Sequence, residues 1–144
     1  MNEYKFKDMA VGLTQSFSVD ITDEMMDLFL RLSGDCNPLH IHKEFAESKG
    51  FADRVVYGML TSSFYSTLAG VYLPGRYCLL SGVDIAFHKP VYVGDTLTIT
   101  GEIAFISEST GQIEMKARIQ NQKNEKVSNA KIKFALLDID IYAI

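Results

Sequence analysis

Apolar residues in the first half of the chain recur at the three- and four-residue spacing of helices. One helix is predicted directly after Thr22, a typical N-cap, and is expected to stop at Gly34. Its apolar face consists of Met25, Met26, Phe29 and Leu30. A shorter helix is predicted over residues 43–48, closed by Gly50.

A longer helix is predicted from Gly58 to Val71, a stretch without proline, aspartate or glutamate. Its small and apolar residues again follow three- and four-residue steps: Met59, Leu60, Ser63, Phe64, Thr67, Leu68 and Val71. The pattern indicates a helix that is buried on most sides. The run Leu73-Pro74-Gly75 is expected to end it.

In the second half of the chain the apolar period changes to two, which is typical of half-buried antiparallel strands. The alternating apolar sets are Leu97, Ile99, Ile103 and Phe105; Ile113, Met115, Ala117 and Ile119; and Ala130, Ile132, Phe134 and Leu136. A further strand is predicted over residues 78–87, and Gly111 and residues 121–125 supply turns. The economical architecture is α+β, with one antiparallel sheet packed on one buried helix.

Composition narrows the possible partners and locations. At 144 residues the chain, residues 1–144, is most simply one domain, and its net charge of −4 without a basic block argues against a nucleic-acid partner. It has neither a membrane-length apolar run nor a signal-peptide profile at its N-terminus. Cys36 and Cys78 lack paired metal-ligand spacing, so we expect no metal site and a cytoplasmic location. A disulfide between them remains open.

The segment Ser33-Gly34-Asp35-Cys36-Asn37-Pro38-Leu39-His40 is the main candidate for chemistry. Its turn-forming residues predict a compact loop instead of regular structure. Such a loop could bring Asp35 and His40 to one water, which is the pair that moves two protons near neutral pH. In the alternative interpretation, Asp35 caps a turn and His40 is a satisfied loop histidine.

A second candidate is Gly58, at the predicted start of the long helix. The first N–H groups of a helix lack internal partners and carry its positive dipole, and a glycine lets a substrate carbonyl approach them closely. Gly58 is therefore a candidate oxyanion site, although it could merely permit tight packing. Ser63, within the same helix, is of a type that usually bonds to its own helix.

Taken together, these segments resemble the MaoC-like hydratase/dehydratase family, which includes (R)-specific enoyl-CoA hydratases. The resemblance runs from about Phe6 to Leu137 and rests on three blocks. They are Ser33–His40 with Phe45-Ala46; Val55-Val56-Tyr57-Gly58-Met59-Leu60; and Phe87-His88-Lys89-Pro90-Val91-Tyr92-Val93-Gly94-Asp95-Thr96.

The resemblance implies a hot-dog fold, in which a curved antiparallel sheet wraps around a long central helix, and a homodimer or higher homo-oligomer. It implies that Asp35 and His40 are the active-site pair, that Gly58 donates an N–H to the thioester oxygen, and that Ser63 lines the site. Asn37 and Tyr57 are further candidates for substrate binding. Tyr57 departs from the family pattern, because many relatives have histidine before Gly-Met-Leu.

The implied reaction is the reversible hydration of trans-2-enoyl thioesters to (R)-3-hydroxyacyl thioesters, carried out by a hydro-lyase without metal or cofactor. The acyl carrier would be coenzyme A or acyl carrier protein, in fatty acid metabolism. A hot-dog thioesterase is one alternative, but such enzymes usually place a carboxylate on the central helix, and residues 58–71 contain none. The other alternative is a non-catalytic subunit that binds acyl thioesters.

Overall fold

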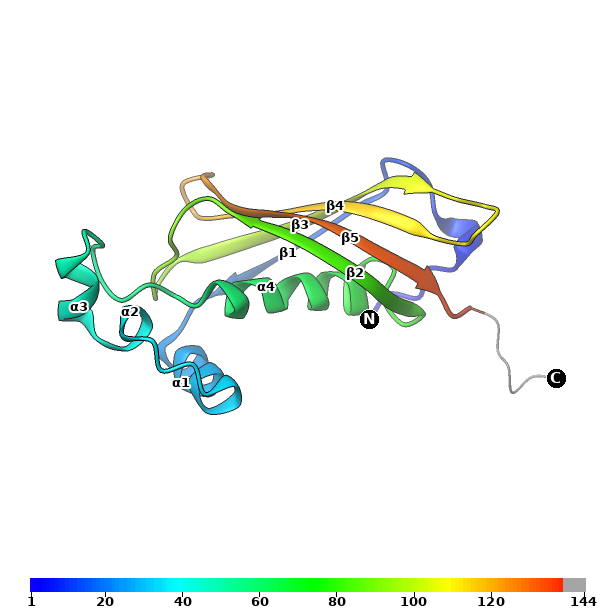
Figure 1. Ribbon diagram of the computed structural model, residues 1–144. Coiled ribbons are helices and arrows are strands. Elements are labelled where there is room, and N and C mark those ends of the chain that lie inside the picture. The colour runs from blue at the N-terminus through cyan, green and yellow to red at the C-terminus, as the bar shows by residue number, and fades with distance from the viewer. Residues whose placement is uncertain (139–144) are drawn as a thin grey trace.

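A curved antiparallel sheet of five strands forms one layer of the protein (Figure 1). The computed structural model describes residues 1–138. The strands are β1 (Thr14–Asp20), β2 (Cys78–Phe87), β3 (Thr96–Ile106), β4 (Ile113–Gln120) and β5 (Lys126–Leu136). Their spatial order is β1-β3-β4-β5-β2, which leaves β2 at one edge.

The second layer is the long helix α4 (Gly58–Thr67), which lies along one face of the sheet (Figure 1). A π-helical turn over Leu68–Tyr72 extends it, so the predicted helix from residue 58 to 71 is confirmed with a change of helical type near its end. A sheet wrapped over a central helix is the hot-dog arrangement, as predicted. The shorter helices α1 (Asp23–Ser33), α2 (Pro38–Ile41) and α3 (Lys43–Ser48) lie near the start of α4 (Figure 1).

The core lies between the helix and the inner face of the sheet. On β4 the predicted alternation is confirmed, since all four apolar residues from Ile113 to Ile119 are buried and their neighbours are not. The helical side of the core consists of Leu60, Tyr65, Leu68 and Ala69. Within residues 1–138, none of the helices has the length and apolar character needed to cross a bilayer.

The π-helical turn packs closely on the sheet at Gly101 of β3. A Cβ atom added there would lie 2.5 Å from Met115 Sδ and 2.8 Å from Leu68 Cδ2. We expect Gly101→Ala to lower the free energy of unfolding by about 1–3 kcal/mol, because the core must shift to admit a methyl group. Urea unfolding of both variants at the same protein concentration measures this free energy. Gly82→Ala is the control, because a Cβ added at Gly82 would lie 4.0 Å from its nearest neighbouring atoms. Equal midpoints for the two variants would contradict the packing argument.

The structure also corrects the expected strands. The sequence interpretation missed β1, although Phe17 and Val19 alternate there with serines. The strand was easy to miss because it is short and largely polar, and it depends on pairing with β3 along its whole length. Phe105 was expected to face the core, but the strand register shifts between Ile103 and Phe105, and Phe105 is 53% exposed.

The helix α4 is less completely enclosed than its composition suggested. Met59 was assigned to the buried set but is 63% exposed, and Ser63 and Ser66 are exposed on α4 as well. Buried positions such as Leu60 and Tyr65 alternate with this stripe at helical spacing. One side of the central helix is therefore open in the single chain.

Candidate functional site

The Asp-x-Asn-Pro-x-His segment contains a helical turn, where the sequence predicted irregular structure. Asn37 is the N-cap of α2, and its Oδ1 accepts the Leu39 N–H at 2.9 Å. Pro38 occupies the first turn, where its missing N–H removes no helical bond. The turn-forming pair Asn-Pro thus starts a helix here, and His40 lies on it.

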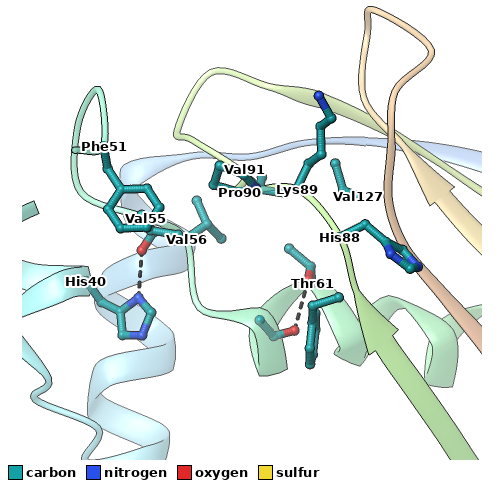
Figure 2. Close-up of a pocket in the computed structure, with 12 residues that line it drawn as sticks. His40, Phe51, Val55, Val56, Thr61, His88, Lys89, Pro90, Val91 and Val127 are labelled. Atoms are coloured by element: carbon teal, nitrogen blue, oxygen red, sulfur yellow. Dashed lines mark hydrogen bonds between the residues drawn. The ribbon is translucent and has the colours of Figure 1, made fainter. Parts of the chain in front are cut away.

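The imidazole of His40 is held in one orientation. Its Nδ1 lies 2.7 Å from the backbone oxygen of Val55 (Figure 2). Because a carbonyl oxygen only accepts, Nδ1 carries the proton in this bond, and Nε2 keeps its lone pair. The segments that carry His40 and Val55 are also joined through the backbone, since the Val55 N–H donates to the Leu39 oxygen at 3.0 Å. In this tautomer, Nε2 of His40 can accept a hydrogen bond or a proton.

Asp35 is exposed at the surface, directly after the end of α1. One carboxylate oxygen accepts the Asn37 N–H at 3.1 Å, and the backbone oxygen accepts the Tyr57 hydroxyl at 2.8 Å. Among residues 1–138, no hydrogen bond joins Asp35 directly to His40. The second carboxylate oxygen keeps its capacity to accept or carry a proton.

Gly58 is the first residue of α4, directly after the N-cap Tyr57. Its carbonyl accepts the hydroxyls of Thr61 and Ser62 at 2.9 and 2.8 Å. Its N–H, in the first turn, has no partner within the helix and lies at the positive end of the dipole. A Cβ added to Gly58 would lie 2.9 Å from Phe87 Cε1, so the absence of a side chain lets the Phe87 ring pack closely against the start of α4.

A cavity of about 270 Å³ joins His40 to the start of α4. In Figure 2, His40 and Phe51 lie on one side of it and His88 and Lys89 on the other. Its walls are mostly apolar with a few polar groups, which is typical of sites for small organic molecules. The lining residues are His40, Phe51, Val55, Val56, Gly58, Thr61, Phe87, His88, Lys89, Pro90, Val91 and Val127.

Two of the six predicted site residues, His40 and Gly58, line this cavity directly. Asp35 is exposed and is not among the lining residues, Asn37 caps α2, and Tyr57 is buried. Ser63 lies outside the cavity lining: its Oγ donates to the Leu60 oxygen at 2.6 Å, as a mid-helix serine usually does.

Sequence reasoning named two of the twelve lining residues, His40 and Gly58, as parts of the site and missed the other ten. A signal was available for two of those ten, Thr61 and Phe87. Thr61 comes three residues after Gly58, one helical turn along α4, so its side chain lies near the same helix end. Phe87 begins the third block that carried the family resemblance.

The other chemistry-bearing groups have simple surroundings. Cys36 and Cys78 are free thiols, and burial raises the pKa of Cys78 to about 11. Burial and then the nearby Asp35 charge raise the pKa of Tyr57 above its ordinary value, so its hydroxyl remains a donor. In the described part of the chain, no three His, Cys, Asp or Glu side chains are grouped so that they could hold a metal ion.

Comparison with curated proteins gives two informative relatives. The chain is 35% identical over 95 residues to an (R)-specific enoyl-CoA hydratase from Rhodospirillum rubrum, which covers 66% of each protein. It is 31% identical over 99 residues to a 3-hydroxybutyryl-CoA dehydratase from Methylorubrum extorquens, which covers 69% of this chain and 63% of the relative. The chain thus spans about two thirds of the length of these relatives.

The fold agrees with a solved structure of the same kind. An (R)-hydratase from Aeromonas caviae, described as involved in PHA biosynthesis, has a TM-score of 0.86 and 30% identity to this chain. The match covers 90% of this chain and 98% of that one. Residues 8–132, which include Asp35, His40 and Gly58, also match the family model described as a MaoC like domain. The chain belongs to the MaoC-like hydratase/dehydratase family.

Proposed function

We propose that the protein is a hydro-lyase that adds water to trans-2-enoyl thioesters, forms (R)-3-hydroxyacyl thioesters, and catalyses the reverse dehydration. The observation that carries this proposal is the His40 imidazole, with Nδ1 bonded to the Val55 oxygen and Nε2 free, in a cavity shared with Gly58. A hydratase and a dehydratase among the relatives fit one reversible reaction. The proposal treats residues 1–144 as one catalytic domain.

The chemistry requires two proton transfers and one new C–O bond. In the proposed sequence, His40 Nε2 removes a proton from a water held between His40 and Asp35, and the water oxygen bonds to C3. The electrons of the C2–C3 double bond move toward the thioester carbonyl and form an enolate. The proton on His40 passes to Asp35, which delivers it to C2, so that both side chains end in the protonation states in which they began. In the dehydration direction each step runs in reverse.

The enolate oxygen needs a donor where its negative charge develops. We assign this role to the Gly58 N–H, since it lies in the first turn of a ten-residue helix and borders the same cavity as His40. The apolar walls formed by Val56, Val91 and Val127 lower the local dielectric constant beside this donor, which strengthens the interaction. No metal or redox cofactor enters these steps.

The acyl carrier is proposed to be coenzyme A or acyl carrier protein. Two cations near the cavity are already paired, Arg54 with Asp23 and Lys89 with Glu125, so a carrier phosphate would compete with these carboxylates. Ser63 could contact an acyl chain only if the chain extended along the open face of α4. We place the enzyme in the cytoplasm, which suits its free thiols.

We propose a second copy of the chain as the partner at the open edge of the sheet. Strand β2 is an edge strand, and its outer backbone groups are free to pair with another strand. Apolar side chains that face inward on β2, opposite buried positions of β5, are 40–53% exposed: Leu80, Val83 and Phe87. Together with Met59 on α4, they form an apolar surface that a second protomer would cover.

Val83→Asp is expected to convert this dimer to a monomer, because a carboxylate would be buried without a partner at the interface. Size-exclusion chromatography with light scattering measures the mass. Phe105→Asp is the control, since Phe105 is also an exposed apolar residue but lies on β3, away from the β2 edge. Dissociation of both variants alike, or a wild-type monomer at micromolar concentration, would contradict the proposed interface.

The function is tested by incubating the protein with crotonyl-CoA while the absorbance of the enoyl thioester and the release of free thiol are followed in parallel. Loss of the enoyl band without thiol release supports hydration, and varied chain lengths then define the substrate. Thiol release indicates a thioesterase. If neither the enoyl absorbance nor the free thiol changes for any chain length or carrier, while acyl thioesters still bind, the protein is a non-catalytic subunit.

A further inference from the structure

Tyr57 contacts each part of the proposed catalytic machinery. Its side chain is only 2% exposed, and its hydroxyl donates to the Asp35 backbone oxygen at 2.8 Å. Its ring stacks on the His40 imidazole, with centroids 4.2 Å apart and planes 29° apart. It also directly precedes Gly58 as the N-cap of α4.

We propose that Tyr57 is a positioning residue, which holds Asp35 and His40 in a fixed relation to the start of α4. This inference rests on the function proposed above, because it assigns a role within that site. It differs from the sequence-based expectation that Tyr57 binds substrate, since the hydroxyl is already committed to a backbone group of the protein.

The hydroxyl matters because the segment that carries Asp35 has little else to hold it. Residues 34–37 are all exposed. Within the described residues, their other hydrogen bonds join groups at most four positions apart, such as Asn37 N–H to Asp35 Oδ1 and Gly34 N–H to the Leu30 oxygen. The bond from Tyr57 spans 22 positions and is the one that anchors this segment to α4.

The aromatic ring provides the second part of the anchor. Besides His40, it packs against Phe29 of α1, with centroids 4.7 Å apart. The His40 ring therefore has two restraints: the Val55 carbonyl bonded to Nδ1 and the Tyr57 face. Because burial keeps the Tyr57 phenol protonated, its hydroxyl remains a donor through the pH range in which histidines titrate.

Two substitutions separate the parts of this role. Tyr57→Phe removes only the hydroxyl and is expected to lower kcat about five- to tenfold with KM changed less than about twofold, as for one lost hydrogen bond. Tyr57→Leu also removes the stacked ring, and we expect kcat to fall about a hundredfold through misplacement of the catalytic groups. The matched control is Tyr65→Phe, which removes another buried hydroxyl, bonded to Ser128 Oγ at 2.7 Å, away from the motif.

A readout that does not need activity completes the test. Backbone NMR order parameters of Cys36 and Asn37 are expected to be about 0.85 in the wild type and Tyr65→Phe, and below about 0.6 in the Tyr57 variants. The His40 imidazole is expected to shift from one tautomer to a mixture in Tyr57→Leu. Unchanged order parameters and His40 signals in folded Tyr57→Phe, or equal changes in Tyr65→Phe, would overturn the inference. A wild type without hydratase activity would refute the proposed function alone, because the NMR comparison still decides whether Tyr57 positions the motif.

Discussion

Replacement of His40 by alanine is expected to lower kcat for the hydration of crotonyl-CoA by about a thousandfold, while the protein stays folded. The variant loses the base at Nε2, and a positioned general base contributes about 10²–10⁴-fold. The fold should persist because His40 lies on a short four-residue helix at the rim of the cavity, outside the core. Initial rates of crotonyl-CoA hydration measure the loss of kcat, and circular dichroism on the same samples measures whether the fold persists.

Asp35→Asn is the companion variant and is expected to lose activity by a similar factor, since an amide can neither accept nor deliver the proton for C2. It keeps the oxygen that accepts the Asn37 N–H, so the local turn is retained. His42→Ala serves as control, because His42 is exposed and, within residues 1–138, its side chain makes no capping bond at the start of α3. Activity within threefold of wild type in both Asp35→Asn and His40→Ala would exclude the assigned pair.

Gly58→Ala is expected to lower kcat/KM about a hundredfold, comparable to the loss of one oxyanion donor. The N–H itself remains, but a methyl group would stand beside it, only 2.9 Å from Phe87 Cε1. The backbone at Gly58 is helical and lacks a positive φ, so alanine adds no backbone strain, and the exposed Phe87 ring must shift to admit the methyl group. Steady-state kinetics should therefore show a large loss, while the thermal unfolding midpoint stays nearly unchanged.

The double variant Gly58→Ala with Phe87→Ala identifies the source of that loss. If crowding between the new methyl group and Phe87 displaced the helix start, removal of the Phe87 ring should restore most of the activity. If the methyl group blocks the thioester oxygen, activity stays low in the double variant. Unchanged kinetics in Gly58→Ala alone would remove this N–H from the mechanism.

Much of the fold could be predicted because local chemistry and tertiary packing agree. Thr22 and Gly34 mark the ends of α1, where the Thr22 hydroxyl accepts the Met25 N–H and Gly34 adopts a left-handed conformation. The strict alternation on β4 corresponds to a strand buried on one face. β1 could not be read as easily, because its stability comes from pairing with β3, far along the chain.

The site shows the same division between local and long-range information. Asp35, His40 and Gly58 could be singled out because each is a reactive or permissive residue in a short motif. The bond from Tyr57 to Asp35 and the approach of Phe87 to Gly58 join segments 22 and 29 residues apart, and only the folded chain brings them together. The short helix α2 was mistaken for a loop because Asn and Pro favour turns and helix starts alike.

The most direct test of the account is incubation with crotonyl-CoA in oxygen-18 water, followed by mass spectrometry of the product. Hydration through a water held by Asp35 and His40 predicts that the label enters the C3 hydroxyl of an intact 3-hydroxyacyl thioester. Label in a free carboxylate, with released thiol, would contradict the account, because water would then have attacked the thioester carbonyl.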